Sequence, residues 1–343
     1  MDTKRPNLSK IVEKLKKEFG EEVVVEKKMK PVESISTGNI TIDYILGPGG
    51  FPRGRIIELF GEEGSGKSSL SLLTISNLVK SGGIAGYIDL ENAVDMSYAQ
   101  KLGVNIDNLL LVQPNSGDEG LSIAEKMVEE GVDLIVVDSV AAIVTKKELE
   151  GEIYDDRVAT QARLMSQALR RLTAKVSKHN ACVIFINQIR QMIGVTFGNP
   201  ETTPGGKALK FYASVRLEVR GGKGGSRVKD DRGNTIGHII TVCAVKNKVA
   251  LPYRKYNVML IYERGIEDTE SLIDILVNSG VISNPKQGTY ILPNGKSFYG
   301  KNNIFEYVRE HTQEVRNWLF AESLPTVVEN KEDNLEQLEQ PNN

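Results

Sequence analysis

One glycine-rich segment constrains the fold more than any other part of the chain. Residues 61–68, Gly-Glu-Glu-Gly-Ser-Gly-Lys-Ser, match the spacing G-x-x-x-x-G-K-[ST] of a P-loop. The apolar run at residues 55–60 predicts a buried strand before it, and a helical pattern follows it. In such a unit, backbone N–H groups and the helix N-terminus bind phosphates. The candidate nucleotide-binding residues here are Gly61, Glu62, Glu63, Gly64, Ser65, Gly66, Lys67, Ser68 and Ser69.

Two side chains of this segment have specific expected roles. Lys67 reaches the β- and γ-phosphates of ATP and is a candidate catalytic residue, and the hydroxyl of Ser68 ligates Mg²⁺. A chance glycine turn is the alternative interpretation. The strand before it, the helix after it and an acid further along the chain disfavour that alternative.

Polar residues end three further apolar runs, and parallel strands would bring them to one edge of a sheet. Asp138 would emerge beside Ser68 and hold Mg²⁺ through water, although a lone aspartate at a strand end is more often a helix cap. Glu91 can activate the attacking water, with a solvated loop glutamate as the alternative. Gln188 can sense the γ-phosphate, or it can be a satisfied buried amide.

Composition excludes several classes of protein. The 343 residues carry 43 Lys plus Arg against 45 Asp plus Glu, so a nucleic-acid site would have to be a local patch. Two cysteines, Cys182 and Cys243, lie in apolar runs and are expected to be buried, which leaves no disulfide framework. Three scattered histidines suggest no zinc motif. With neither a signal peptide nor a long apolar run, we expect a cytoplasmic protein.

Alternating strand and helix patterns predict an α/β fold with a mostly parallel twisted sheet covered on both faces. Strands are expected at residues 84–90, 109–112, 134–137, 182–186, 213–219, 239–246 and 256–262, with helices at 121–130 and 159–178. After Gly265 a small α+β module is expected, with a helix at 271–279, a hairpin at 289–298 and a last helix at 304–320. The expected domains are residues 1–32, 33–265 and 266–322, followed by a polar tail at 323–343 that we expect to be disordered.

The amino-terminal segment predicts an amphipathic helix. Apolar residues between Leu8 and Phe19 fall at helical spacing, with charged residues on the opposite face. The stripe needs a partner, which is either its own domain or a neighbouring subunit reached through residues 21–31. An oligomerisation role for residues 1–32 follows from the second alternative.

A long connection follows Gln188 and extends to residue 206. It combines Arg190 with the apolar residues Ile193, Val195 and Phe197 and several glycines. Such a loop suits contacts to phosphates and wedging of apolar groups between bases, whereas a surface loop of no function seldom carries so many apolar residues. A shorter connection at residues 152–158 is a candidate companion loop that faces DNA.

These motifs together resemble the bacterial RecA recombinase family over nearly the whole chain, from Ile11 to about Phe320. The resemblance rests on residues 34–38, the P-loop, 87–91, 136–142, 185–190 and 197–203, which follow one another in family order. It implies a RecA-type P-loop core with an amino-terminal helix and a small carboxy-terminal domain.

The resemblance also implies the activity. A protein of this family is a DNA-dependent ATPase that forms a helical homopolymer on single-stranded DNA with ATP and Mg²⁺, pairs it with homologous duplex and promotes strand exchange. It acts in DNA repair and in the SOS response by stimulating repressor self-cleavage, and loader proteins are further expected partners. The implied DNA-binding residues are Val158, Arg163, Arg170, Arg190, Ile193, Phe197, Gly205 and Gly206.

Further roles come from the resemblance alone. Tyr98 would stack on adenine beside Asp95, and Phe211 would lie at a subunit contact. Lys246 and Lys248 would reach the γ-phosphate of the adjacent subunit as catalytic residues, although lysines that alternate along a strand are more often a solvated face.

The sequence departs from the family pattern at several positions. Thr241 and Cys243 stand where basic residues serve a second DNA site, a role that Lys223, Arg227 and Lys229 are hypothesised to take over. Two other classes of protein stay open, a non-catalytic filament component and a P-loop motor such as a ring helicase. The intact catalytic set disfavours the first, and the long apolar loop disfavours the second.

Overall fold

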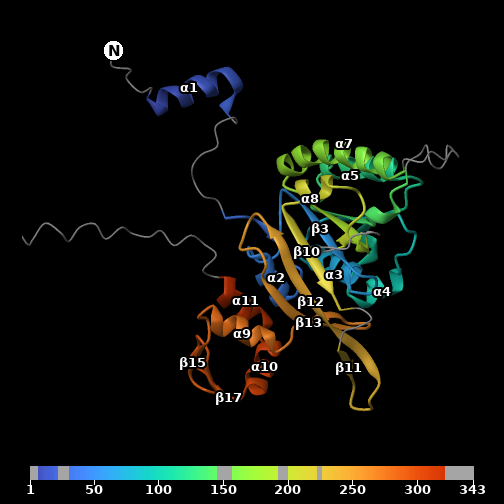
Figure 1. The fold of residues 1–343 in the computed structure, drawn as a ribbon. Helices are drawn as coiled ribbons and strands as arrows, with labels where there is room; N and C mark the ends of the chain where they lie inside the picture. Colours follow the sequence, from blue (N-terminus) through green and yellow to red (C-terminus); the bar gives the residue numbers. More distant parts are fainter. Residues whose placement is uncertain (1–6, 22–30, 145–156, 192–199, 222–225, 321–343) are drawn as a thin grey trace, which may run out of the picture. The chain divides into compact units, whose positions relative to one another are not determined.

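The computed structural model describes residues 7–21, 31–144, 157–191, 200–221 and 226–320, and of residues 157 and 158 the backbone alone (Figure 1). The chain divides into two units, residues 32–323 and the two terminal segments 1–31 and 324–343, which are described separately. The expected loop at residues 152–158 and the polar tail therefore lie largely outside the described residues.

A ten-stranded sheet organises the described part of the larger unit, in the order β14-β13-β12-β10-β3-β7-β6-β4-β5, with β11 paired to β12. The strands from β10 to β5 in this order run parallel, and β12, β13 and β14 continue the sheet antiparallel. The predicted mostly parallel sheet is confirmed. The strands are β3 (Arg55–Gly61), β4 (Ala85–Asp89), β5 (Leu109–Val112), β6 (Leu134–Asp138), β7 (Cys182–Gln188), β10 (Val215–Arg220), β11 (Arg227–Lys229), β12 (Thr235–Asn247), β13 (Lys255–Ile261) and β14 (Gly265–Glu267).

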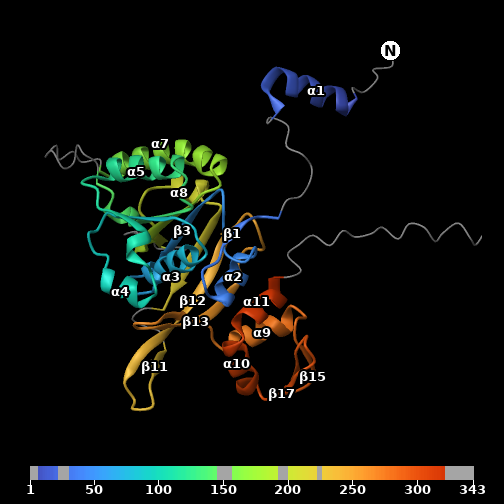
Figure 2. The same ribbon diagram turned by 180° about the vertical axis from the view of Figure 1, so that it is seen from behind.

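Helices cover both faces of this sheet (Figures 1 and 2). Alternate residues of one strand enter different cores: Ile57 and Leu59 pack with the helix α3 (Lys67–Lys80), whereas Ile56 packs with α5 (Gly117–Glu129) and α7 (Arg157–Lys178). Both side-chain rows of the central strands are apolar because both faces are buried. The shorter helices are α2 (Ile40–Leu46), α4 (Met96–Lys101) and α8 (Ala208–Tyr212), and two short strands, β1 (Ser34–Ile35) and β2 (Phe51–Pro52), pair beside the main sheet.

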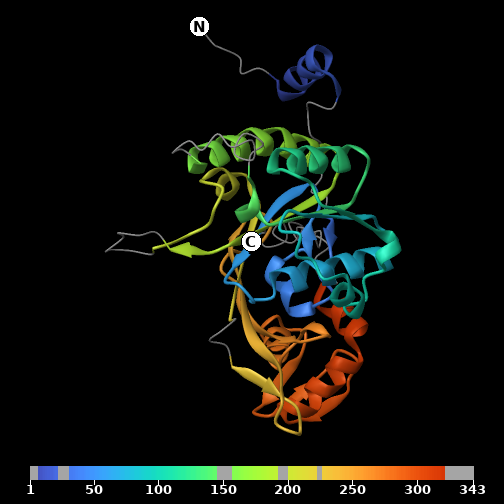
Figure 3. The same ribbon diagram turned by 90° about the vertical axis from the view of Figure 1, so that its right-hand side faces the viewer.

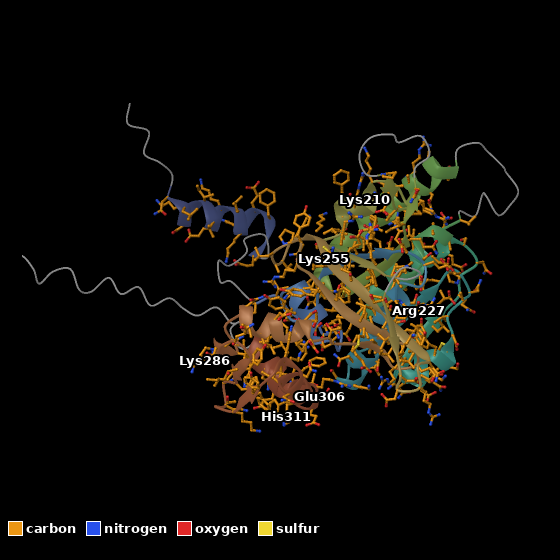
Figure 4. All side chains as sticks on the ribbon, turned by 60° about the horizontal axis from the view of Figure 1, so that its bottom comes forward. Lys210, Arg227, Lys255, Lys286, Glu306 and His311 are labelled. Carbon is orange, nitrogen blue, oxygen red and sulfur yellow. The ribbon has the colours of Figure 1, made fainter. Side chains whose placement is uncertain are left out.

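The small carboxy-terminal part has its own apolar core. Its helices are α9 (Ser271–Asn278), α10 (Lys301–Glu310) and α11 (Thr312–Phe320), and its strands β15 (Ser283–Lys286), β16 (Thr289–Ile291) and β17 (Ser297–Tyr299) form an antiparallel sheet. Figure 4 shows Lys286, Glu306 and His311 on this part, and Lys210, Arg227 and Lys255 on the elements of the larger sheet and its helices.

Two expectations from the sequence were wrong in detail. The last helix is not continuous from 304 to 320 but ends before His311, where the backbone leaves helical geometry (φ −117°) and the hydroxyl of Thr312 binds the carbonyl of Arg309. By contrast, the predicted hairpin is confirmed, because β16 and β17 pair antiparallel, and β15 extends them to a three-stranded sheet. Cys243 is only half-buried, because every second side chain of β12 near it faces solvent, whereas Cys182 is buried; both are free thiols.

The helix α1 (Leu8–Phe19) confirms the predicted amphipathic helix. Its apolar residues remain exposed in the described chain, with Leu8 61% and Phe19 60% accessible. None of the helices in the described ranges has the length and apolar character needed to cross a membrane.

A buried carboxylate on α2 connects this helix to the carboxy-terminal part. The fully buried Asp43 forms an ion pair with Arg316 and accepts hydrogen bonds from the hydroxyl of Ser36 and from the backbone and hydroxyl of Thr37. Arg316 also donates to the carbonyl of Gly49. Burial raises the pKa of Asp43, and Arg316 opposes that rise.

We therefore expect Arg316→Ala to lower the free energy of unfolding by about 3 kcal/mol at neutral pH, because Asp43 would stay buried without a counter-charge. Its pKa would rise further, so the folded state would bind more protons than the unfolded state, and the deficit should shrink as the pH falls towards that pKa. Urea denaturation at several pH values measures both effects.

The matched control is Arg309→Ala, which removes long ion pairs of an exposed guanidinium with Glu306 (3.4 Å) and Glu267 (4.0 Å) and should cost less than about 1 kcal/mol. A deficit in Arg316→Ala that does not depend on pH would contradict the assignment to Asp43.

Candidate nucleotide-binding and DNA-facing site

The P-loop connects β3 to α3 as the sequence predicts. Gly61 ends the strand against β10, and a Cβ atom there would lie 1.9 Å from the carbonyl oxygen of Val219. Gly66 caps α3 in the left-handed region (φ 92°), where a Cβ atom would lie 3.0 Å from the side chain of Leu260. Glycine is therefore required at both positions. The first intrahelical hydrogen bond runs from Leu70 to Gly66, so the N–H groups before Leu70 point out of the helix N-terminus.

Lys67 lies folded against this loop. Its Nζ donates to the carbonyl oxygens of Gly61 (3.2 Å) and Glu62 (2.6 Å), and only 7% of the residue is exposed. Burial lowers the pKa of Lys67, although the carboxylates of Asp138 and Glu91 oppose that effect. A desolvated ammonium at a helix N-terminus is a strong binding group for phosphate anions.

Asp138 emerges beside the first turn of α3, as predicted. Its Oδ2 accepts hydrogen bonds from the hydroxyls of Ser68 (3.0 Å) and Tyr87 (2.5 Å). Burial raises the pKa of Asp138, and these two hydrogen bonds counteract the rise. The contact from Tyr87, a core residue that is 1% exposed, was not predicted from the sequence.

Glu91 is held at the same edge by neighbours that the sequence analysis did not single out. The hydroxyl of Ser139 donates to Glu91, and the buried Asp89 accepts from the backbone N–H groups of Glu91 (3.2 Å) and Val94 (3.1 Å). The turn after β4 is thereby fixed so that Glu91 faces Asp138. In the sequence, the position of Asp89 at the end of an apolar run was the signal that could have revealed this contact.

These groups line a pocket of about 260 Å³. Opposite the P-loop lies α4, whose Tyr98 hydroxyl is 2.8 Å from the hydroxyl of Ser69. Asp95 lines the pocket too, but its carboxylate caps α4 by accepting from the N–H groups of Ser97 and Tyr98. Further lining residues include Glu63, Gly64, Lys67, Ser68, Tyr87, Asp89, Glu91, Asp138, Ser139, Ile186 and Gln188.

The donor set fits a hard divalent cation. Ser68 and Asp138 offer a hydroxyl and a carboxylate, the oxygen ligands that Mg²⁺ prefers. The described residues contain no cluster of three or more potential ligands among histidine, cysteine, aspartate and glutamate. A cation bound here would complete its shell from phosphate oxygens and water, as Mg²⁺ commonly does in nucleotide sites.

Gln188 lines the pocket at the end of β7, and the residue before it, Asn187, contacts the end of the segment 189–206. Asn187 accepts the N–H of Gln188 (3.0 Å) and donates to Glu58 and to the carbonyl of Pro204, both at 3.1 Å. Glu58 is fully buried on β3, accepts the hydroxyl of Thr203 (3.0 Å) and pairs with Arg216. Both ends of the segment 189–206 are therefore attached to one carboxylate. Sequence spacing did not reveal this cluster.

The predicted long loop has structured ends. The strands β8 (Arg190–Gln191) and β9 (Glu201–Thr202) pair antiparallel, and Figure 3 shows these ends side by side in yellow-green. Arg190 is exposed on this ribbon. Ile193 and Phe197 lie outside the described residues, as does the side chain of Val158.

The helix α7 brings other predicted DNA-binding residues together. Arg163 and Arg170 are exposed and two turns apart, and hence on one face. Gly205 and Gly206 approach the same helix with φ of 85° and 72°, and a Cβ at Gly206 would lie 3.0 Å from that of Ala162. Only glycine permits this close approach.

The lysines Lys246 and Lys248 do not enter the nucleotide pocket of their own chain. The Nζ of Lys246 donates to the carbonyl oxygens of Lys210 (2.7 Å) and Phe211 (3.0 Å), and Lys248 is exposed. The ring of Phe211 is 70% exposed.

A P-loop at the centre of a mostly parallel sheet, with carboxylates at the neighbouring strand ends, defines a nucleotide-binding P-loop ATPase core. The solved structure of the RadB recombinase has a similar fold, with a TM-score of 0.52 and 23% identity over 68% of this chain and 99% of that one. Residues 6–267 match the model of the RecA N-terminal domain.

Curated relatives extend the match to almost the whole chain. It is 47% identical to Protein RecA of Staphylococcus carnosus over 91% of this chain and 88% of the relative. It is 45% identical to Protein RecA of Streptococcus pyogenes serotype M49 over 91% and 83%. The chain belongs to the RecA family. It is a DNA-dependent ATPase of recombination and repair that binds nucleotide and DNA and self-associates.

The Glu58 cluster generates a prediction for the coupling of DNA to hydrolysis. In Glu58→Gln the half-buried Arg216 loses its counter-charge, so the free energy of unfolding should fall by about 3 kcal/mol. The stimulation of ATP hydrolysis by single-stranded DNA should fall about fivefold, because one amide oxygen cannot accept from Arg216 and from Asn187 and Thr203 together, which weakens the anchor of the segment 189–206. ATPase assays with and without DNA, combined with urea denaturation, measure both quantities.

Glu130→Gln is the matched control, because it disrupts only an exposed i,i+4 pair with Lys126. It should leave stimulation unchanged. Normal DNA stimulation in a folded Glu58→Gln protein would show that the anchor does not act in coupling.

Proposed function

We propose that the protein polymerises on single-stranded DNA as a helical filament and uses ATP bound at the seam between protomers to pair that strand with homologous duplex and exchange strands. The observation that carries the proposal is the run from Gln188 in the nucleotide pocket through Asn187 to both ends of the segment 189–206. Nucleotide state at one end of this run can alter how the DNA-facing segment is held at the other.

Within the pocket, the proposed roles follow from placement. The loop residues 61–69 cradle the phosphates, Lys67 neutralises the β- and γ-phosphates, and Tyr98 with Asp95 bounds the adenine side. Ser68 and Asp138 hold Mg²⁺, which supplies charge neutralisation for the phosphates when bound. Glu91 accepts a proton from the attacking water, and its hydrogen bond from Ser139 orients the carboxylate.

For DNA, the proposal uses the exposed face of α7 and the segment beside it. Arg163 and Arg170 contact phosphates, and the backbone of Gly205 and Gly206 approaches the strand closely. Arg190, Val158, Ile193 and Phe197 complete the primary site, the last two between bases.

Two sets of groups that take no part in the nucleotide pocket of their own chain support the proposal of a seam between protomers. Lys246 and Lys248 lie outside their own pocket and are proposed to reach the γ-phosphate bound to the adjacent protomer as catalytic residues. The exposed apolar stripe of α1 is proposed to dock on a neighbour, with residues 1–32 as the oligomerisation segment, 33–265 as the core and 266–322 as the carboxy-terminal domain.

Two finer roles are part of the proposal. The filament stimulates self-cleavage of an SOS repressor and is loaded by other recombination proteins. The exposed Arg227 and Lys229, which alternate along β11, capture duplex DNA together with Lys223.

The catalytic assignment is tested by comparing Lys67→Ala with Glu91→Gln in strand-exchange, ATPase and nucleotide-binding assays. Lys67→Ala should abolish exchange and nucleotide binding, because the phosphates lose their buried counter-charge. Glu91→Gln should bind nucleotide normally but hydrolyse it at least about 100-fold more slowly. Strand exchange that survives Lys67→Ala would contradict the proposed phosphate role.

The architecture is tested by electron microscopy of the protein with single-stranded DNA and a non-hydrolysable ATP analogue. We expect extended helical filaments. A variant with Ile11→Asp and Leu15→Asp should not polymerise, because charges would replace the stripe of α1, whereas Lys10→Asp on the other face should polymerise. Closed rings would favour a ring motor over a recombinase.

A further inference from the structure

Tyr87 is a buried residue to which the proposed mechanism gives no role. It lies on β4 within the core beneath α3, with 1% of its surface exposed. Its hydroxyl is nevertheless directed to the nucleotide pocket, which it lines, and donates to Oδ2 of Asp138 at 2.5 Å. A buried phenol needs some acceptor. The acceptor here is the carboxylate proposed to hold the metal.

The strand register explains why the two side chains meet. The parallel strands β4 and β6 pair Tyr87 with Val136 and Asp89 with Asp138. Alternate residues share a face, so Tyr87 and Asp138 both point towards α3 and are diagonal neighbours. The first turn of α3 then places the hydroxyl of Ser68 3.0 Å from the same Oδ2. One oxygen thus accepts from two hydroxyls.

The chemistry of a metal-bound hydroxyl makes this arrangement consequential. A serine hydroxyl has one proton and two lone pairs. To present a lone pair to a cation, Ser68 must direct its proton to an acceptor, and Oδ2 of Asp138 is in place for that. The direction of the lone pair therefore depends on where Oδ2 is held. Groups that orient metal ligands in this way commonly change metal affinity when removed.

Resting on the proposed Mg²⁺ role of Ser68 and Asp138, we infer that Tyr87 is a positioning residue for the metal: its hydroxyl fixes Oδ2 of Asp138 so that Ser68 presents a lone pair to the cation. The ring of Tyr87 is locked in the core, so the position of its hydroxyl is set by the packing of β4 against α3. Tyr87 does not itself bind the metal.

The test is Tyr87→Phe in the full-length protein, which deletes the hydroxyl and keeps the ring. Binding of Mn²⁺ in the presence of a saturating non-hydrolysable ATP analogue is followed by electron paramagnetic resonance of the free ion. We expect the affinity for Mn²⁺ to fall about tenfold. The Mg²⁺ concentration for half-maximal hydrolysis should rise by a similar factor, while the rate at saturating Mg²⁺ changes less than about twofold.

Three further proteins separate the inference from the proposal beneath it. Tyr256→Phe removes a hydroxyl from a half-buried tyrosine of β13 outside the pocket and should leave Mn²⁺ affinity unchanged. Asp138→Asn should weaken Mn²⁺ binding strongly. Adding Tyr87→Phe to Asp138→Asn should cause no further loss, because the tyrosine acts through the carboxylate.

The outcomes are distinguishable. Unchanged Mn²⁺ affinity in Asp138→Asn would overturn the proposed metal site itself. A loss in Asp138→Asn with normal affinity in Tyr87→Phe would overturn only the positioning role, and so would a further loss in the double variant. Thermal unfolding of each variant shows that a change in affinity does not arise from partial unfolding.

Discussion

The arrangement of both sites depends on the interactions of one buried carboxylate, that of Glu58. It lies on the central strand β3, directly before the P-loop, in a core that excludes water. An isolated charge there would be strongly unfavourable, so its partners are required rather than optional. Those partners come from β7, from the end of the DNA-facing segment and from β10: Asn187, Thr203 and Arg216. The groups that bind the charge of Glu58 therefore connect the strand that carries the P-loop to the segment proposed to bind DNA.

The nucleotide pocket follows from the same sheet. Parallel strands deliver their carboxyl ends to one edge, and β3, β4, β6 and β7 contribute the P-loop, Glu91, Asp138 and Gln188 there. Two carboxylates at this edge are bound by hydroxyls, Asp138 by those of Ser68 and Tyr87 and Glu91 by that of Ser139. A hydroxyl holds an acid in place without neutralising it. Both carboxylates are thereby held in place at the pocket without a counter-charge bound to them among the described residues.

Much of this arrangement could be predicted from the sequence. The remainder could not, and the reason is physical. Four features are local signals in the sequence, because each directly follows an apolar run: the P-loop, Glu91, Asp138 and Gln188. The structure brings all of them to one pocket. The Tyr87–Asp138 contact and the Glu58 cluster depend on register between strands that are far apart in the chain. The break at His311 depends on side-chain bonds to the backbone, which helical periodicity does not reveal.

The contacts of Lys246 within a single chain do not account for the role proposed for this lysine. Burial lowers the pKa of Lys246, and its ammonium donates to the carbonyl oxygens of Lys210 and Phe211 in α8. Carbonyl oxygens are neutral partners, so they do not offset the charge of an ammonium that they bind. The same short helix follows Gly205 and Gly206 and ends at the exposed Phe211. An anion that binds Lys246 would therefore act on α8, and through it on the segment 189–206, which ends just before this helix.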